Sequence, residues 1–375
     1  MSSPDVDKEE SPTVQVTLEQ LLRLMFEKGA SDMHITAHAP PYLRVDGDVF
    51  PIKIPPLSPA DTRHLIFSIL TQKQIAAFEE KHELDISFEL KGVSRFRGNV
   101  FYQRGTVAAS MRTIPFKIRT FADLGCPPVV AELCNRPAGL VLVTGATGSG
   151  KSTTLASMID MINTEQRVHI MTIEDPIEFV HANKLSIINQ REVGDDTYGF
   201  QQALKSVLRQ DPDCVLVGEM RDLETIEAAL TIAETGHLVF GTLHTSTAVS
   251  TINRIIDVFP PHQQDQVRTK LSFVLQGVIC QQLLPRADGP GRALGLEVMV
   301  PTPAIRNLMR EGKNHQIYGQ MQLGQGKSGM LTLNQCLMQH LAAKKISVEI
   351  AMERTSEPDE LRGLIEKWRT SGGVG

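Results

Sequence analysis

An eight-residue motif near the middle of the chain constrains the fold more strongly than any other feature of the sequence. Residues 145–152 read GATGSGKS, which matches the pattern G-x-x-x-x-G-K-[ST]. The apolar run Leu140–Val143 precedes the motif, and a helix-compatible run begins at Lys151. A strand, a glycine-rich loop and a helix in this order form a phosphate-binding loop, so the motif predicts an α/β nucleotide-binding domain.

The residue types in the motif explain how such a loop holds a nucleotide. Glycines let successive backbone N–H groups curl around an anion, and the N-terminus of the following helix adds partial positive charge. The Lys151 amine suits the β- and γ-phosphates, and the Ser152 hydroxyl suits Mg²⁺. We therefore predict ATP and Mg²⁺ as ligands. The predicted nucleotide-binding residues of the loop are Gly145, Thr147, Gly148, Ser149, Gly150, Lys151, Ser152 and Thr153.

The pattern beyond the motif extends the α/β prediction along the second part of the chain. From Gly139 onward, apolar strands alternate with helices, which is typical of βαβ units and a mainly parallel sheet. After Pro260-Pro261 the sequence indicates mostly helix, apart from a strand at Leu294–Val300. The other predicted strands are 140–144, 168–173, 214–217 and 238–242, and helices are predicted to begin at Lys151, near Phe200 and at Asp222.

The first third of the chain has a different pattern and predicts a separate α+β domain. Thr17 begins a helix, with Gln20 in the capping-box position, and a hairpin is expected around Asp46-Gly47. A helix from Ser58 to about Lys81 and strands at 85–90, 95–102 and 107–113 follow. We therefore divide the chain into a disordered tail (1–14), an N-terminal domain (15–113), a proline-containing linker (114–127) and a nucleotide-binding domain (128–370).

Composition argues against several classes of protein. Lys and Arg number 38 against 43 Asp and Glu, and only 5% of residues are aromatic, which disfavours a protein dedicated to nucleic acid. The five cysteines show no C-x-x-C spacing, so a cysteine-rich zinc site is not expected. The N-terminus lacks the basic start and apolar core of a signal peptide, and no apolar run is long enough for a membrane span. We expect a cytoplasmic protein with no nucleic-acid partner.

Two carboxylates follow predicted strands and are candidates for catalysis. Glu178 comes after the strand 168–173, and Glu219 comes after the strand 214–217, where the acid of a Walker B motif would stand. Hydrolysis of Mg·ATP needs a carboxylate near the metal and another that orients water. Solvation or helix capping is the alternative explanation for an acid in such a loop.

Two histidines and two arginines are weaker candidates for phosphate contacts. His237 and His244 bracket the strand 238–242, either as contacts of the γ-phosphate or as ordinary polar residues. Arg97 and Arg112 lie on neighbouring strands of the first domain. They are either solvated residues of a strand face or arginine fingers that reach a phosphate across a domain or subunit boundary.

Five segments in chain order carry a resemblance to a known family. They are GATGSGKST (145–153), TIEDPIE (172–178), LVGEMRD (216–222), ETGHLVFGTLHT (234–245) and AIRNLMRE (304–311). Together they resemble the secretion-ATPase superfamily and, within it, the PilT family of type IV pilus retraction (twitching motility) ATPases. GASDMHI (29–35) and RFRGNVFYQR (95–104) resemble the first domain of that family, so the resemblance runs from about Thr17 to Ala351.

The resemblance implies a role for each candidate residue. Glu178 would be the general base, Glu219 would be the acid of an atypical Walker B motif, and Lys151 would complete the catalytic set. Ser152 and Glu219 would form the metal site. The remaining nucleotide contacts implied by the resemblance are His237 and His244 from the His box and Arg97 and Arg112 from the first domain.

The resemblance also implies the fold, the assembly and the partners. A PAS-like N-terminal domain would precede a RecA-like P-loop domain with a helical C-terminal part. Six chains would form a ring with ATP between the two domains. The ring would act on an inner-membrane platform protein of the PilC type at the pilus base, with a PilU-type paralogue as a further partner.

The segment AIRNLMRE bears on the direction of the motor. It resembles a helix that the family associates with retraction, whereas its apolar spacing alone favours a packed core helix. The alternatives to a retraction motor are a PilU-like accessory pilus ATPase and a RecA-like nucleic-acid or conjugation motor.

Overall fold

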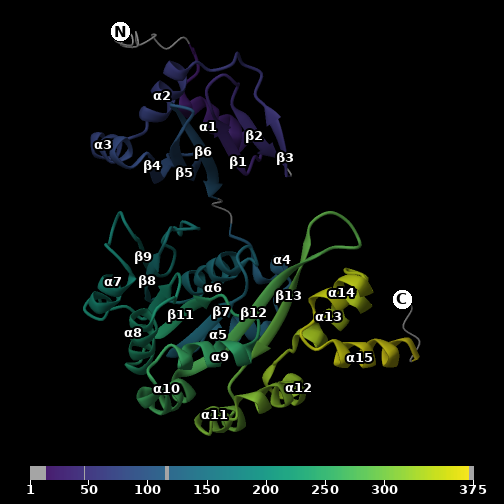
Figure 1. The fold of residues 1–375 in the computed structure, drawn as a ribbon. Helices are drawn as coiled ribbons and strands as arrows, with labels where there is room; N and C mark the ends of the chain where they lie inside the picture. The colour runs from purple at the N-terminus through teal and green to yellow at the C-terminus, as the bar shows by residue number, and fades with distance from the viewer. Residues whose placement is uncertain (1–13, 46, 115–117, 371–375) are drawn as a thin grey trace, which may run out of the picture. The chain divides into compact units, whose positions relative to one another are not determined.

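The computed structural model describes residues 14–45, 47–114 and 118–370. The chain divides into two compact units, residues 1–117 and 118–375, and each unit has its own sheet (Figure 1). Residues 1–13 of the predicted tail lie outside the described residues, as do the predicted turn residue Asp46 and residues 115–117 of the predicted linker.

The N-terminal unit is an antiparallel sheet packed against helices. Its six strands have the order β3-β2-β1-β6-β5-β4, and Phe78 of α3 and Phe96 of β5 are fully buried in its core. The strands are β1 (Asp32–Ile35), β2 (Tyr42–Val45), β3 (Asp48–Pro51), β4 (Glu83–Leu90), β5 (Ser94–Gln103) and β6 (Thr106–Ile114), and the helices are α1 (Leu18–Glu27), α2 (Pro59–Phe67) and α3 (Gln72–Lys81). The expected capping box of Thr17 and Gln20 is present at the start of α1.

The predicted helix from Ser58 to about Lys81 is in fact two helices. α2 ends at Phe67, and α3 begins at Gln72. Thr71 and Gln74 form a capping box, in which the Thr71 N–H donates to Gln74 Oε1 at 2.9 Å and the Gln74 N–H donates to Thr71 Oγ1 at 3.3 Å. These bonds satisfy the N–H groups that a continuous helix would use, so a new helix starts at this point.

The second unit is built on a seven-stranded sheet with the order β13-β12-β7-β11-β10-β8-β9. Every neighbouring pair is parallel except β12 and β13, so the prediction of a mainly parallel sheet is confirmed. The strands are β7 (Gly139–Thr144), β8 (His169–Glu174), β9 (Ile187–Glu192), β10 (Cys214–Val217), β11 (Leu238–Leu243), β12 (Leu275–Pro285) and β13 (Arg292–Met299).

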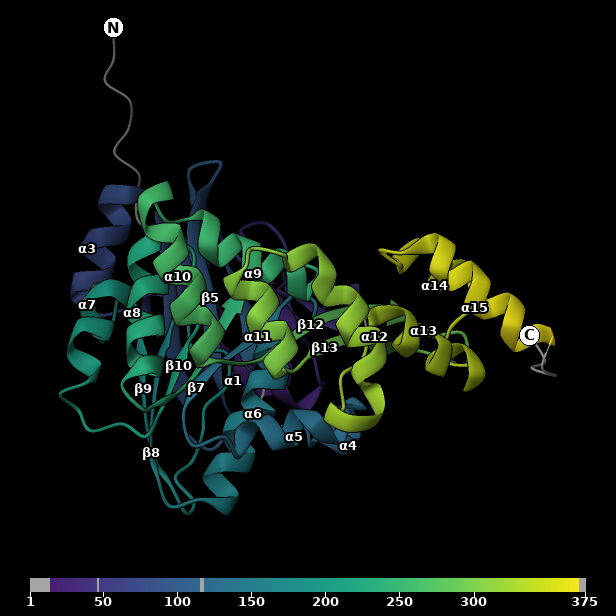
Figure 2. The same cartoon turned by 90° about the horizontal axis from the view of Figure 1, so that it is seen from below.

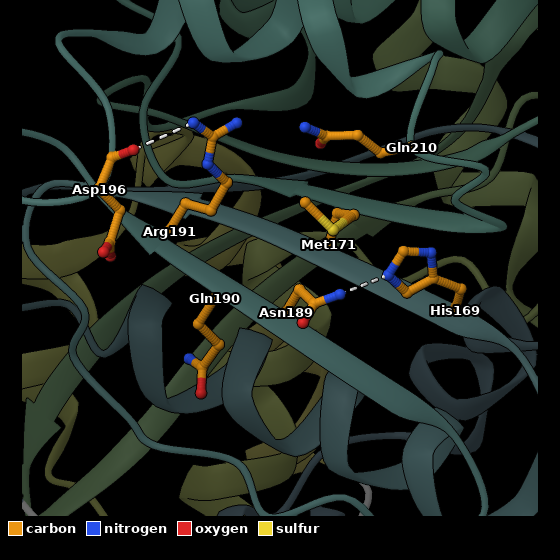
Figure 3. A pocket seen from close by; sticks show the side chains of 7 residues that line it. All are labelled: His169, Met171, Asn189, Gln190, Arg191, Asp196 and Gln210. Carbon is orange, nitrogen blue, oxygen red and sulfur yellow. Dashed lines mark hydrogen bonds between the residues drawn. The ribbon is translucent and has the colours of Figure 1, made fainter.

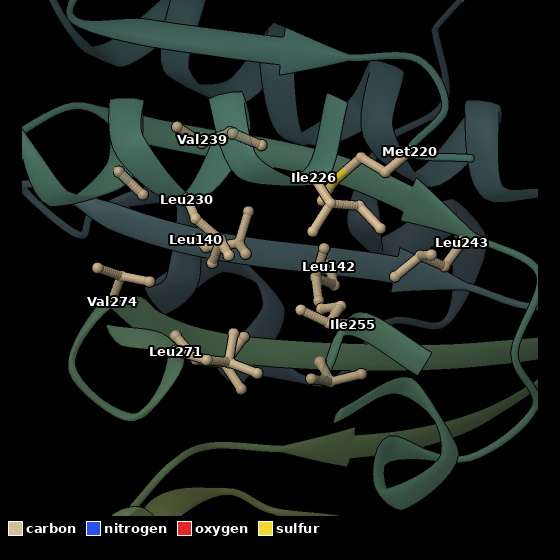
Figure 4. Packing of buried hydrophobic residues seen from close by; sticks show 14 of the residues in the cluster. Leu140, Leu142, Met220, Ile226, Leu230, Val239, Leu243, Ile255, Leu271 and Val274 are labelled. Atoms are coloured by element: carbon tan, nitrogen blue, oxygen red, sulfur yellow. The ribbon is translucent and has the colours of Figure 1, made fainter. Parts of the chain in front are cut away.

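Helices cover both faces of this sheet (Figures 1 and 2). Leu140 and Leu142 of β7 pack on one face among apolar side chains of α8, α9 and α10 (Figure 4). Val141 and Val143 alternate with them and pack on the other face against α5 and α6. A strand buried on both sides reads as a continuous apolar run, which explains the composition of β7.

Two strands of the sheet are not predicted by the sequence analysis. β9 lies at one edge, and β12 lies between β7 and β13, in a region where mostly helix is expected. The expectation for this region is wrong because three glutamines leave the segment 275–285 only short apolar runs, of which 277–280 is the longest. Such a run fits a buried strand or a buried helix equally well.

The helices of the second unit follow the predicted starts at Lys151, Phe200 and Asp222, the last of which is the N-cap of α8. They are α4 (Phe121–Leu124), α5 (Pro128–Cys134), α6 (Lys151–Glu165), α7 (Phe200–Val207), α8 (Leu223–Glu234), α9 (Ala248–Asp257), α10 (Pro261–Val274), α11 (Pro303–Arg310), α12 (Ile317–Ser328), α13 (Leu333–Ala342), α14 (Val348–Arg354) and α15 (Pro358–Thr370), with a 3₁₀ turn at Asn314–Gln316. In the described part of the chain, none of the helices combines the length and apolar character needed to cross a membrane.

The AIRNLMRE segment lies in α11. Ile305 and Met309 are buried in the core, Leu308 is partly buried, and Ala304 is exposed. The four apolar residues therefore do not all share the buried face that their spacing indicates. The core contacts of this helix come from Ile305 and Met309.

Candidate nucleotide-binding site

The phosphate-binding loop leaves β7 at Thr144 and enters α6 at Lys151. The strands β7, β11, β10 and β8 are parallel neighbours, so their carboxyl ends meet at one edge of the sheet. Thr144 pairs with Leu243 of β11, and the Gly145 N–H donates to the Leu243 carbonyl at 3.3 Å. The loop therefore lies beside the residues that follow β11. This edge is where open α/β sheets bind their ligands.

Glycines shape the loop. Gly145, Gly148 and Gly150 have φ values of +142°, +78° and +90°. A Cβ atom at Gly145 would lie 2.3 Å from the carbonyl oxygen of Gln281, a backbone atom that cannot rotate away. Gly150 is also the N-cap of α6, and no side chain caps this helix. The first N–H groups of α6 are therefore open to an anion.

The Lys151 side chain folds back over the loop. Its Nζ donates to the carbonyl oxygens of Gly145 at 2.8 Å and Ala146 at 3.2 Å. Burial lowers the pKa of Lys151, and the charge of Glu219 opposes this effect. A phosphate would offer the amine a charge-assisted bond stronger than those to the two carbonyls. Ser152 is exposed in the first turn of the same helix.

Glu219, Arg221 and His244 form a bonded group at the same edge. His244 Nε2 lies 2.9 Å from Glu219 Oε1, Arg221 Nε lies 2.5 Å from that oxygen, and Arg221 Nη2 donates to Glu219 Oε2 at 2.6 Å. Burial acts to raise the pKa of Glu219, but the bonds and charges of Arg221 and His244 outweigh it, so the pKa is lowered. Glu219 is therefore an anion at neutral pH, held beside Lys151.

Glu178 lies in the loop after β8, and its side chain is exposed. Within the described residues, that side chain makes no hydrogen bond or ion pair. Its neighbour Glu174 accepts bonds from Thr172 Oγ1 at 2.6 Å and Gln190 Nε2 at 3.2 Å, and burial raises the pKa of Glu174. Glu178 is thus on the expected edge of the sheet, and its role as general base stays a prediction.

His237 is not brought together with this group. His237 directly precedes β11, which begins at Leu238. Leu238 pairs with Gly139, the first residue of β7, so His237 lies at the starting end of β7. The phosphate loop follows the other end of β7. The two ends of a six-residue strand are about 17 Å apart. The His237 ring instead bonds the carbonyl of Ile232 at 3.1 Å, which closes the end of α8.

Arg97 and Arg112 face each other across β5 and β6 of the N-terminal unit. Both side chains are exposed. Arg112 Nε donates to Asp32 Oδ1 at 2.8 Å, an ion pair that the sequence analysis does not predict. Two adjacent guanidinium groups are of the kind that bind an anion. The contact of these arginines with a nucleotide stays a prediction.

The structure adds two residues that the sequence analysis misses. Arg221 lies inside the LVGEMRD segment, two residues after Glu219. This short spacing in the sequence is the feature from which its contact with Glu219 could have been predicted. Gln281 lies on β12 and donates from Nε2 to the Ser149 carbonyl at 2.8 Å. No sequence signal connects these residues, because 132 positions separate them and β12 is not predicted.

An open hollow of about 470 Å³ lies over β8 and β9 (Figure 3). Its polar groups already bond one another, since Asn189 Nδ2 lies 2.9 Å from His169 Nε2 and Arg191 Nη2 donates to the Asp196 carbonyl at 3.1 Å. None of the phosphate-loop residues lines it, so it is distinct from the candidate site. The lining residues are His169, Met171, Asn189, Gln190, Arg191, Asp196 and Gln210.

The residues of the loop fit a nucleotide phosphate. The α6 N-terminus is uncapped, Lys151 is nearby, and the Ser149 Oγ is buried with no hydrogen-bond partner among the described groups. No three His, Cys, Asp or Glu side chains of the described ranges converge on a point that could hold a metal ion. Mg²⁺ in a nucleotide site needs only one or two protein ligands, because phosphate oxygens and water supply the others. Ser152 and Glu219 are of the required kind.

The fold and the site together define a P-loop ATPase in which an antiparallel α+β unit precedes an α/β unit. A family described as Type II/IV secretion system protein matches residues 7–360. The type IV pilus retraction ATPase PilT of Pseudomonas aeruginosa is 53% identical over 340 residues, which cover 91% of this chain and 98% of that protein. The type IV pilus ATPase PilU of the same organism is 41% identical over 348 residues, with 93% and 91% covered.

A solved structure agrees with these relatives. The crystal structure of the pilus retraction motor PilT with bound ADP superposes with a TM-score of 0.88 at 53% identity, covering 93% of this chain and all of that one. The chain belongs to the type II/IV secretion system protein family, and it is an ATPase of that family. The predictions of the fold class, of a nucleotide-binding ATPase and of the resemblance to pilus retraction ATPases are confirmed.

Proposed function

We propose that this chain is the ATP-driven motor that powers retraction of type IV pili. The observation that carries the proposal is the phosphate loop with Lys151, set beside the bonded Glu219 and His244 at the edge of the sheet. The sequence is more similar to the retraction ATPase PilT than to PilU, at 53% against 41% identity. The AIRNLMRE segment supports the retraction branch through the family resemblance.

The nucleotide is held by the loop. The N–H groups at the start of α6 and the Lys151 amine surround the phosphates, and Lys151 exchanges its carbonyl partners for phosphate oxygens. His244 contacts the terminal phosphate from the end of β11. The proposed loop contacts are Gly145, Thr147, Gly148, Ser149, Gly150, Lys151, Ser152 and Thr153.

Hydrolysis uses the acids at the strand ends. Glu178 orients and polarises the attacking water, and its exposed carboxylate is accessible for this role. Lys151 offsets the charge that develops on the transferred group. Ser152 and Glu219 hold Mg²⁺, which neutralises phosphate charge when it is bound. Arg221 and His244 keep Glu219 ionised, and their bonds to its two oxygens must give way where the cation binds.

Arg97 and Arg112 supply further positive charge to the phosphates from the N-terminal unit. Nucleotide-driven rotation of one domain against the other converts hydrolysis into movement, which is a common hinge mechanism. We further propose a ring of six chains on the cytoplasmic side of the inner membrane. It acts on a PilC-type platform protein at the pilus base, with a PilU-type paralogue as a second partner and no nucleic acid.

The enzymatic part of the proposal is tested by Lys151→Ala. We expect the ATP hydrolysis rate to fall by at least a hundredfold, since both phosphate binding and charge compensation are lost. Lys184→Ala is the matched control, because the Lys184 amine pairs with Asp160 at 2.6 Å and donates to Thr164 at 3.0 Å, both in the later turns of α6. Wild-type hydrolysis by Lys151→Ala would overturn the site assignment.

The cellular part is tested in cells whose only copy carries Glu219→Ala. We expect many static surface pili, because extension continues while retraction stops. Fluorescent labelling of the pili counts filaments and retraction events directly. An absence of pili would indicate an extension motor, and normally retracting pili would overturn the role of Glu219 in retraction. Glu234→Ala, which removes a half-exposed acid paired with Lys270, is the control.

A further inference from the structure

Gln281 lies directly beneath the phosphate loop. It is on β12, next to β7 in the sheet, and only 4% of the residue is exposed. Its Nε2 donates to the Ser149 carbonyl at 2.8 Å in a fully buried hydrogen bond. Gln281 also packs closely against both ends of the loop. A Cβ atom at Gly145 would lie 2.3 Å from the Gln281 carbonyl oxygen, and a Cβ atom at Gly150 would lie 3.2 Å from Gln281 Nε2.

This bond fixes the orientation of one peptide group in the loop. In a trans peptide the C=O of one residue and the N–H of the next point in opposite directions. Because the Ser149 carbonyl points down to Gln281, the N–H of Gly150 points up, on the side away from β12. Gly150 has a φ of +90° and no side chain, so its own conformational preferences do not hold this orientation.

The burial of Gln281 has an energetic disadvantage that calls for a reason. Its Oε1 is buried with no hydrogen-bond partner among the described groups, and such an atom destabilises a fold. A leucine in the same place would fill similar space at this buried position and avoid the unpaired oxygen. What the amide adds over leucine is a donor for the Ser149 carbonyl.

We propose that Gln281 is a positioning residue of the nucleotide site. It holds the Ser149–Gly150 peptide so that the Gly150 N–H faces the bound phosphate. The inference rests on the nucleotide site proposed above and adds the residue that organises it before nucleotide arrives. Preorganised N–H donors bind an anion better than donors that must first be ordered.

The test compares Gln281→Leu with Gln282→Leu in the full-length chain. Gln282 is the next residue on β12, and its side chain bonds the Arg354 carbonyl at 3.1 Å, away from the loop. We expect Gln281→Leu to bind ADP about tenfold more weakly, the factor that one hydrogen bond carries. Gln282→Leu should bind within about twofold of wild type, since it removes a bond of the same class at a remote place. Isothermal titration with ADP measures both.

Amide hydrogen exchange of the nucleotide-free protein supplies a second readout. Gln281→Leu should increase the exchange rate in the peptide that covers residues 146–152, while β7 stays protected. Gln281→Asn keeps the amide but is too short to reach Ser149. It replaces Gln281→Leu in the comparison if the leucine variant does not fold, and we expect it to show the same weaker binding and faster exchange. Thermal unfolding of each variant confirms that the comparison is made between folded proteins.

The outcomes separate this inference from the proposed function. If the wild type binds ADP and Gln281→Leu binds it with equal affinity and equal loop protection, the role of Gln281 is overturned and the nucleotide site stands. If the wild type fails to bind ADP, the proposed nucleotide site itself fails. A weaker affinity confined to the Gln281 variants supports the inference.

Discussion

A buried carboxyl on β13 makes the stability of the ATPase unit depend on pH. Glu297 is 2% exposed, and its Oε1 accepts the Ala248 N–H at 2.7 Å. The Leu333 backbone also bonds this carboxyl, so one side chain joins the first residues of α9 and α13. α9 follows the loop that carries His244. Burial raises the pKa of Glu297 to about 7, although the two backbone bonds oppose it.

The size of the effect follows from this pKa. Each tenfold change in proton affinity corresponds to about 1.4 kcal/mol, so a rise from 4.5 to about 7 corresponds to about 3 kcal/mol. The folded state holds the proton more tightly than the unfolded chain. The contribution of Glu297 to stability is therefore fully present below pH 4.5, is lost as the pH rises toward 7, and is constant above that.

The perturbation is Glu297→Gln, which removes the titration and keeps the shape. The free energy of unfolding of the wild type, minus that of the variant, should fall by about 3 kcal/mol between pH 4.5 and pH 8. Urea unfolding at fixed ionic strength and at several pH values measures this difference. Glu234→Gln, at an exposed ion pair, should show almost no such trend. A constant difference between the wild type and Glu297→Gln across the range would refute the reasoning.

Three further substitutions test the loop, the acid beside it and the helix break. Gly145→Ala should abolish ADP binding in a titration, because its Cβ meets the Gln281 carbonyl at 2.3 Å, whereas Gly148→Ala has open space and should be milder. Arg221→Ala removes the stronger of the two groups that lower the pKa of Glu219, so the acid limb of the pH–rate profile should move to higher pH. Thr71→Ala should lower the unfolding free energy by about 1 kcal/mol in urea titrations through loss of the α3 cap.

Much of the fold can be predicted from local patterns. The loop at 145–152 needs no tertiary information, because its glycines and lysine stand between a strand and a helix in the sequence itself. The start of α8 is likewise predicted by Asp222, whose side chain accepts the Thr225 N–H at 2.8 Å. β12 could not be assigned in this way, since its apolar residues are interrupted by three glutamines and have neither a clear period of two nor one of 3.6.

Because β12 is not predicted from the sequence, its residue Gln281 could not be assigned to the site. The chemistry-bearing ends of β7, β10 and β11 can be expected at one edge, because parallel strands place their carboxyl ends together. The support beneath the loop comes instead from the middle of β12, an interior strand position where sequence patterns predict only apolar packing. Gln281 is an exception to that pattern. The strand order explains it, because β12 lies next to β7 and places the Gln281 amide within hydrogen-bond distance of the Ser149 carbonyl. A buried amide with one atom unpaired among the described groups marks the place where the sheet holds the phosphate loop in its binding conformation.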